Sequence, residues 1–163
     1  MTEPSFSIGI SAPRQNCLVV VTCPNCGKKN RVPAAVKGRP RCAQCHQDLP
    51  WIAEAGDAEF SAVVEDASLP VVVDLWAPWC GPCRMISPAL EEVATQFRGR
   101  MKLVKVNVDE SPATASRFRV QGIPTLLVFD QGRLVDRSVG AKGAAELRAW
   151  IEPLLTRNTP NLP

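Results

Sequence analysis

The chain of 163 residues is 45% hydrophobic with a formal net charge of +3, enough for one ordinary core plus a small second unit. The charge is uneven, because residues 1–50 hold seven Lys and Arg against two acids, whereas residues 51–163 hold twelve against fourteen. No apolar run is long enough to span a membrane, and the N-terminus lacks the basic start and hydrophobic stretch of a secretory signal. We therefore expect a cytoplasmic protein, in which paired cysteines serve metal binding or redox chemistry.

Four of the seven cysteines form two C-x2-C pairs near the N-terminus. Fifteen residues separate Cys23 and Cys26 from Cys42 and Cys45, a spacing typical of zinc sites. A segment of about thirty residues buries little core, so metal ligation would supply most of its folding free energy, on the order of 10 kcal/mol. We predict a zinc ribbon over residues 17–50 with these four cysteines as ligands of one structural zinc. Two disulfides, or free thiols in a disordered arm, are the alternative.

The head formed by residues 17–50 is basic around its cysteine pairs. These cations would partly offset the charge of about −2 on a Zn(Cys)4 centre; they are Lys28, Lys29, Arg31, Lys37, Arg39 and Arg41. Nucleic-acid binding is the less favoured interpretation, because no aromatic residue lies between the pairs to stack on bases. His46 adjoins Cys45 and is expected at the surface, while Cys17 has no assigned role. Residues 1–16 and 158–163 are expected to be a flexible extension and a flexible tail.

Beyond Pro50 the periodicity alternates between strands and helices. The expected strands are 51–55, 71–76, 102–109, 125–130 and 134–139, of which 71–76 is apolar on both faces except at Asp74. Helices are expected to start at residues 56, 80 and 111, and a last helix carries Leu147, Ile151 and Leu154. Pro153 is expected to kink that last helix or end it early. This order predicts an α/β fold with a mixed central sheet flanked by helices.

A third C-x-x-C pair follows the strand at 71–76. Cys80 is expected at the start of a helix, where free backbone N–H groups and the helix dipole lower the pKa of its thiol toward neutral. Cys83 lies one turn further in and is expected to stay protonated until a mixed disulfide forms. Half of another zinc site is the alternative for this pair, although the other four paired cysteines already account for each other. Burial in the strand is expected to raise the pKa of Asp74, which suits proton exchange.

Residues 51–157 resemble thioredoxin, through Trp79-Cys80-Gly81-Pro82-Cys83, the upstream Asp74 and the downstream Gly122-Ile123-Pro124-Thr125. With the two N-terminal cysteine pairs, the chain is similar to the zinc-containing thioredoxin 2 type of bacteria. The resemblance implies that residues 51–157 form a thioredoxin domain and that Cys80 and Cys83 are catalytic.

The resemblance also implies roles for residues around the cysteines. Asp74 would accept the Cys83 proton through a water, and Lys105 on the neighbouring strand would modulate that acid. A purely structural acid and a surface lysine are the respective alternatives. A cis bond before Pro124 would bring the Ile123 backbone beside Cys80. The implied substrate-binding surface consists of Trp79, Pro82, Ile123, Pro124 and Gly140.

The expected function is that of an enzyme, a protein-disulfide reductase whose Cys80 and Cys83 exchange thiols with disulfide-containing protein substrates. Electrons would come from a flavin-containing, NADPH-dependent thioredoxin reductase, because the chain carries no Gly-rich nucleotide fingerprint and is expected to bind no nucleotide or flavin. We expect a monomer with a structural or redox-sensitive zinc head and no membrane partner. A zinc-dependent, redox-switched binding module or holdase is the alternative.

Overall fold

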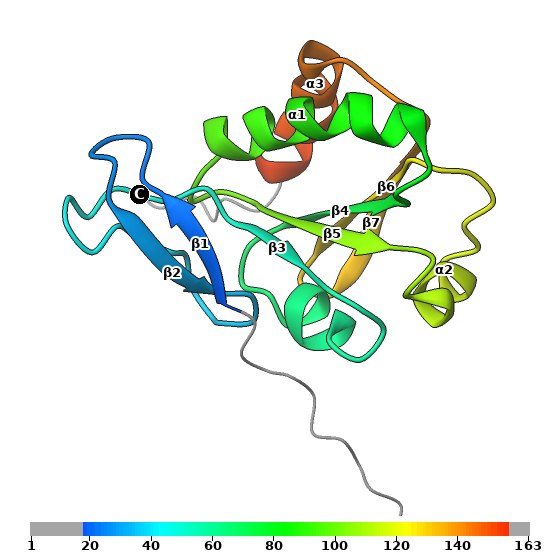
Figure 1. The fold of residues 1–163 in the computed structure, drawn as a ribbon, viewed down its shortest axis with the longest axis horizontal. Coiled ribbons are helices and arrows are strands. Elements are labelled where there is room, and N and C mark those ends of the chain that lie inside the picture. The colour runs from blue at the N-terminus through cyan, green and yellow to red at the C-terminus, as the bar shows by residue number, and fades with distance from the viewer. Residues whose placement is uncertain (1–17, 157–163) are drawn as a thin grey trace, which may run out of the picture.

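The computed structural model describes residues 18–156. The expected extension 1–16, Cys17 and the expected tail 158–163 therefore lie outside the described residues. Within the described range, a small β-hairpin unit precedes a larger α/β unit (Figure 1). None of the helices between residues 18 and 156 is long and apolar enough to cross a membrane.

A five-stranded sheet in the order β3–β5–β4–β6–β7 forms the centre of the larger unit. Its strands are β3 (Ile52–Glu54), β4 (Val71–Trp76), β5 (Lys102–Asn107), β6 (Thr125–Asp130) and β7 (Arg133–Val139). β3 and β4 both run parallel to β5, whereas β6 runs antiparallel to β4, and β7 antiparallel to β6. β4 lies in the middle because its side chains are apolar on both faces, apart from Asp74.

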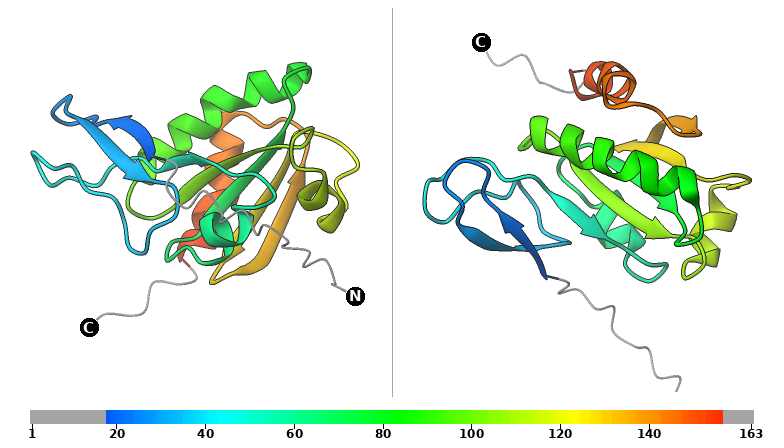
Figure 2. Two further views of the ribbon diagram at one scale, coloured as in Figure 1. Left: turned by 60° about the horizontal axis from the view of Figure 1, so that its bottom comes forward. Right: turned by 45° about the horizontal axis from the view of Figure 1, so that its top comes forward.

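Helices cover both faces of the sheet (Figures 1 and 2). α1 (Gly81–Gln96) and α3 (Ala144–Thr156) pack on one face over buried Ile86, Leu90, Leu147 and Ile151. The other face carries η1 (Ser61–Glu65), a π-helical turn, and α2 (Pro112–Arg117). There the rings of Phe60, Phe118 and Phe129 pack with centroids 5.3 to 5.8 Å apart. The predicted α/β fold with a mixed, helix-flanked sheet is confirmed.

The head is built on an antiparallel hairpin of β1 (Leu18–Thr22) and β2 (Lys29–Pro33). Gly27 follows the first cysteine pair with a φ of 75°, a left-handed conformation that glycine adopts without a side-chain clash. After the second pair, His46 also has a positive φ and is exposed, and a bridge between Arg41 and Asp48 closes the turn. The two strands were not among the predicted elements.

The head is packed against the sheet unit, an arrangement that the sequence left open. Trp51, fully buried, donates a hydrogen bond from Nε1 to the Pro33 carbonyl at 3.2 Å. The Lys102 ammonium lies 4.2 Å from the centre of the Trp51 ring and donates to the carbonyls of Ala34 and Val63. Burial lowers the pKa of Lys102 to about 8, and the two carbonyl acceptors and the indole face offset part of the cost of burying this cation.

A second close approach joins the two units at Gly99, after α1. Its φ is 77°, and a Cβ at this position would lie 2.5 Å from Oδ2 of Asp48 in the head. Only glycine therefore allows both the turn and the contact. No local sequence pattern indicates this contact.

Some expected elements differ from the structure. The start expected for a helix at residue 56 is wrong, because a turn occupies 57–59 and η1 begins only at Ser61. Instead of starting a helix of its own, Asp57 accepts hydrogen bonds from the first turn of α2. An early end at Pro153 is also wrong, since α3 continues to Thr156. The strands expected at 51–55 and 102–109 are shorter in the structure, at Ile52–Glu54 and Lys102–Asn107. The second ends early because Val108 already belongs to the turn before α2.

Candidate redox site and thiol cluster

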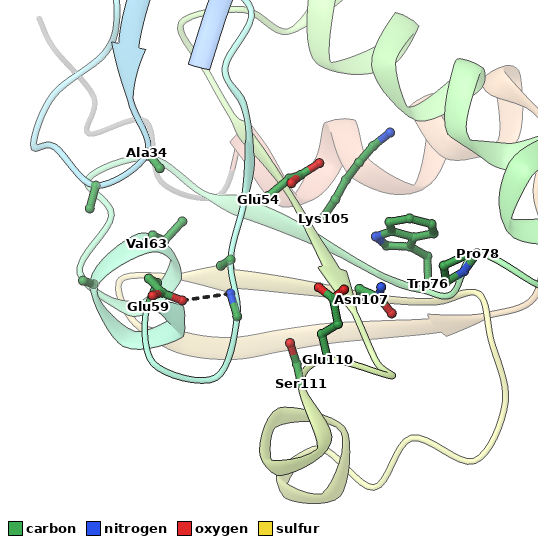
Figure 3. A pocket seen from close by; sticks show the side chains of 14 residues that line it. Ala34, Glu54, Glu59, Val63, Trp76, Pro78, Lys105, Asn107, Glu110 and Ser111 are labelled. Carbon is green, nitrogen blue, oxygen red and sulfur yellow. Dashed lines mark hydrogen bonds between the residues drawn. The ribbon is translucent and has the colours of Figure 1, made fainter. Parts of the chain in front are cut away.

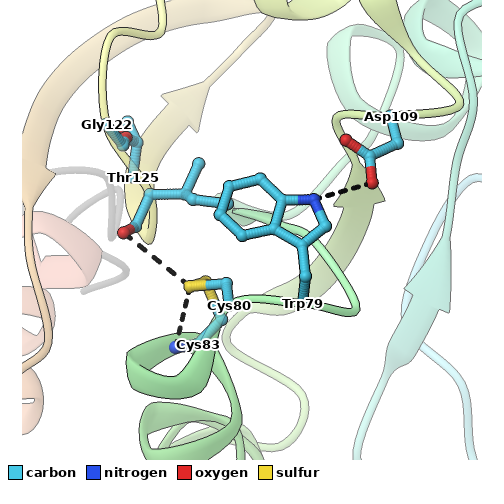
Figure 4. The surroundings of a disulfide bond; sticks show 7 residues. Trp79, Cys80, Cys83, Asp109, Gly122 and Thr125 are labelled. Atoms are coloured by element: carbon cyan, nitrogen blue, oxygen red, sulfur yellow. Dashed lines mark hydrogen bonds between the residues drawn. A yellow bond between two sulfur atoms is a disulfide. The ribbon is translucent and has the colours of Figure 1, made fainter.

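The Cys80–Cys83 pair lies where β4 gives way to α1. Cys80 is the N-cap of α1, with an extended backbone, and its Sγ accepts a hydrogen bond from the Cys83 N–H at 3.2 Å. Gly81 and Pro82 form the first helical turn. The N–H groups of a first turn make no intrahelical hydrogen bond, so the missing N–H of proline costs the helix nothing there. The two cysteines are joined by a disulfide (Figure 4) and are 4% and 2% exposed, respectively. An approaching thiol or disulfide therefore meets Cys80 at the edge of the surface.

Trp79 and the loop before β6 surround this disulfide. Trp79 is 67% exposed, and its indole N–H donates to Oδ2 of Asp109 at 3.0 Å (Figure 4). The peptide bond between Ile123 and Pro124 is cis, as the resemblance implied, and the Ile123 carbonyl oxygen lies 3.8 Å from Cys80 Sγ. Gly140 donates its N–H to the Pro124 carbonyl at 2.9 Å, which ties the end of β7 to this loop. The structure thus brings Trp79, Pro82, Ile123, Pro124 and Gly140 to the region around Cys80.

Asp74 and Lys105 face each other across the β4–β5 pairing. Asp74 is 1% exposed, and its Oδ1 has no hydrogen-bond partner. Burial raises the pKa of Asp74 to about 6; the charge of Lys105 lowers it, and that of Glu91 raises it further. Lys105 is half-buried, which excludes a simple surface lysine, and its ammonium contacts Ser87 and Glu91 of α1 rather than Asp74. Asp74 is therefore a buried carboxyl able to gain or lose a proton near neutral pH.

A cavity of about 610 Å³ extends from the surroundings of the Cys80–Cys83 pair to the head (Figure 3). Trp76 and Pro78 line the end nearest the redox pair, and Ala34 of the head lines the other. Lys105 forms part of its wall, with its side chain rising from β5 toward the helix layer and Glu54 beside it (Figure 3). Trp76 is half-buried against the redox pair, as expected of a packing residue.

The other four paired cysteines converge in the head. Their sulfurs all lie within 4.8 Å of one another, and Cys23–Cys45 and Cys26–Cys42 each approach to 3.6 Å. These distances exclude disulfides, and all four are free thiols. Zinc–sulfur bonds of about 2.3 Å in a tetrahedron require sulfurs about 3.8 Å apart, so the spacing fits zinc.

The charges of the cluster also favour a cation. The pKa of Cys42 is lowered to about 6 despite burial, chiefly by the backbone N–H of Cys45. The backbone N–H of Gln44 and the Asn30 amide also lower it. The backbone N–H of Lys28 lowers the pKa of Cys26, but burial and the neighbouring sulfurs outweigh it and raise the pKa to about 12. A Cys26 thiolate beside the other sulfurs is thus unfavourable without a bound cation. The donor set fits a Zn²⁺ ion.

Several residues of these sites had no sequence signal. Asn30 is buried, donates from Nδ2 to Cys42 Sγ at 3.6 Å and accepts from the Ala43 N–H at 3.0 Å, which fixes a potential ligand. Asp109 holds the Trp79 indole, and Ser87 and Glu91 hold Lys105. Each depends on a partner at least twelve residues away in the chain.

Comparison with known proteins agrees with this geometry. The thioredoxin family model matches residues 51–153. A thioredoxin from Synechocystis sp. is 47% identical over 102 residues, which cover 63% of this chain and 95% of the relative. A thioredoxin from Haemophilus influenzae is 47% identical over 95 residues, or 58% of this chain and 89% of the relative. Thioredoxin C-3 from Corynebacterium nephridii is 36% identical over 146 residues, which cover 88% of this chain and all of the relative.

Proposed function

The chain belongs to the thioredoxin family and has protein-disulfide oxidoreductase activity, and from that premise we propose that Cys80 and Cys83 carry the reaction. The observation that supports this assignment is the position of Cys80 at the N-cap of α1, with a buried acid on the preceding strand. The helix N-terminus stabilises a Cys80 thiolate, which is the nucleophile of disulfide exchange.

The first step forms a mixed disulfide. The Cys80 thiolate attacks one sulfur of a substrate disulfide, so that a bond between Cys80 and the substrate forms while the substrate S–S bond breaks. The second substrate sulfur leaves as a thiolate and takes a proton from water. Trp79, Pro82, Ile123, Pro124 and Gly140 form the docking surface, on which the Ile123 carbonyl lies beside Cys80 and suits an extended substrate segment.

The second step releases the reduced substrate. Cys83 gives its thiol proton, through a water, to the Asp74 carboxylate, and the resulting thiolate attacks Cys80 Sγ. The Cys80–Cys83 disulfide forms, the mixed disulfide breaks, and the departing substrate thiolate is protonated. Two electrons thus pass from the dithiol to the substrate. Lys105 modulates the proton affinity of Asp74, and a flavin-containing, NADPH-dependent thioredoxin reductase restores the dithiol.

We further propose that the head holds one structural zinc through Cys23, Cys26, Cys42 and Cys45, as in the zinc-containing thioredoxin 2 type. When bound, zinc would supply a closed thiolate shell that stabilises the head and keeps its sulfurs out of exchange. The alignment with Thioredoxin C-3 supports a shared head. It covers 88% of this chain, about 143 of its 163 residues, whereas residues 51–163 number only 113, so about thirty or more aligned residues precede Trp51. We assign residues 17–50 to the head and 51–157 to the thioredoxin domain of a cytoplasmic monomer.

Reduction of insulin disulfides tests the catalytic assignment. With NADPH and thioredoxin reductase as the electron source, Cys80→Ser is expected to abolish turnover. Cys83→Ser is expected to accumulate a mixed disulfide between Cys80 and the substrate, visible by mass spectrometry. Cys23→Ser serves as the matched control and is expected to retain turnover. Full activity of Cys80→Ser would refute the assignment.

A further inference from the structure

Lys105 lies between two acids on different elements. It is in register with Asp74 on the adjacent parallel strand. Its Nζ, however, lies 2.5 Å from Ser87 Oγ and 2.6 Å from Glu91 Oε1, both on α1. It forms no ion pair with Asp74 among the described residues. Ser87 also donates to Glu91 Oε1 at 3.5 Å, so the two acceptors form one connected group.

Among the described residues, no hydrogen-bond donor stabilises the charge of Asp74 at Oδ1. Its Oδ1 is buried without a partner, and only 1% of the residue is exposed. An ammonium that moved into direct contact with this carboxylate would strongly favour the charged form. The position of the Lys105 ammonium therefore decides how readily Asp74 takes up a proton.

We propose that Glu91 and Ser87 are positioning residues for proton transfer, because they hold the Lys105 ammonium on α1 and away from the Asp74 carboxylate. The proposal rests on the function proposed above, in which Asp74 accepts the Cys83 proton. A lysine in direct contact with Asp74 would keep that acid ionised and weaken it as a base. A lysine held at a distance still stabilises the charge while leaving the acid able to bind a proton near neutral pH.

The charged and titratable groups near Asp74 come from three elements. α1 contributes Cys83 and Glu91, and β5 contributes Lys105. β6, the other neighbour of β4, places uncharged Leu126 opposite Asp74. β3 contributes Glu54, which is in register with Lys105 and exposed. Apart from Cys83, the charged groups closest to Asp74 are therefore Glu91 and Lys105. The charge of Lys105 lowers the pKa of Asp74, and the charge of Glu91 raises it.

The test measures the pKa of Asp74 directly. The 13Cγ chemical shift of Asp74 is followed against pH in uniformly 13C-labelled oxidised protein, and its signal is assigned by its loss in Asp74→Asn. Glu91→Gln removes the negative charge of Glu91 and so frees the Lys105 ammonium to approach Asp74. The pKa of Asp74 is then expected to fall from about 6 to about 5, because an opposite charge within about 4–6 Å lowers a carboxyl pKa by about 1–3. Ser87→Ala removes one of two acceptors and is expected to change the pKa in the same direction by less.

Two controls separate positioning from direct repulsion and from loss of structure. Glu92→Gln changes the adjacent exposed residue, whose carboxylate accepts a hydrogen bond from Gln96, and is expected to leave the pKa of Asp74 unchanged. In a Lys105→Met background, Glu91→Gln removes only the direct repulsion between the two acids. The fall in the Asp74 pKa is therefore expected to be clearly smaller there than with Lys105 present. Glu91 is exposed, so its variant retains the fold, and thermal unfolding checks this.

Equal falls with and without Lys105, or no fall in Glu91→Gln, would overturn the proposal. A second readout keeps it distinct from the proposed function. A mixed disulfide between Cys80 and thionitrobenzoate is prepared, and release of the coloured thiolate by Cys83 is timed against pH. If the inflection of this rate follows the altered Asp74 pKa, both proposals stand. If the pKa moves but the inflection does not, Glu91 positions Lys105 as proposed and Asp74 is not the proton acceptor.

Discussion

Replacing Asp74 by Asn should change how the stability of the oxidised protein depends on pH. Burial raises the pKa of Asp74 in the folded state to about 6 from an ordinary value of 3.8. The folded state therefore binds more protons than the unfolded state between these values. The stability associated with protonated Asp74 is present below pH 3.8 and is lost as the pH rises through 6.

The magnitude follows from the two pKa values. Ionisation of Asp74 costs the folded state about 3 kcal/mol at pH 8 and roughly half of that at pH 5. Asp74→Asn removes this cost but introduces an amide in a buried position, a change that does not depend on pH. The difference in unfolding free energy between variant and wild type is therefore expected to be larger at pH 8 than at pH 5, by about 1 to 2 kcal/mol.

Urea unfolding of both proteins, followed by circular dichroism at pH 5, 6, 7 and 8, measures this difference. Comparing the two proteins at each pH cancels the titration of all groups that they share, provided that the slope of unfolding free energy with urea is unchanged. A difference that stayed constant between pH 5 and 8 would refute the argument, since it would mean that Asp74 is not a buried acid titrating near neutral pH.

Three further predictions concern other parts of the chain. Burial raises the pKa of Asp57, but hydrogen bonds from Thr114 and from the Ala113 N–H outweigh burial and hold the pKa below its usual range. Asp57→Ala should therefore lower the unfolding free energy by about 1–2 kcal/mol at pH 7, and by less as the pH falls. Cys42→Ser should reduce the zinc content measured by atomic emission from about one ion per chain to nearly none, and retention of zinc would contradict a four-cysteine site. Gly99→Ala should lower the urea midpoint and speed hydrogen exchange in the head, because the added Cβ meets Asp48; unchanged exchange would show that the head is not held there.

The sequence was sufficient wherever structure depends on near neighbours. β4 and β6 have the predicted bounds, because an apolar run ending in Trp-Ala-Pro and another starting after Gly-Ile-Pro-Thr define them locally. The helix start at Cys80 was likewise predictable from Gly81-Pro82. The burial of Asp74 followed from its place in a strand that is otherwise apolar on both faces.

The sequence was insufficient wherever a polar side chain is bound by a distant element. Lys102 starts a strand like an ordinary exposed lysine, yet it is fully buried, because carbonyls of Ala34 and Val63 accept its protons. Asp57 reads as a helix start but binds the first turn of α2 instead. The contacts of Lys105 depend on how α1 lies across the sheet, a geometry that no local pattern specifies.

The position of the head has a consequence for how this chain can be oxidised. The head contacts the sheet near the start of β4, through Trp51 and Leu69, whereas Cys80 follows the end of that strand (Figure 1). Six extended residues span about 20 Å, so a bond of about 2 Å between the two groups of sulfurs is excluded within one folded molecule. The two sets of thiols are thus insulated from each other. Oxidising equivalents can pass from one set to the other only through a diffusible thiol or a second protein molecule.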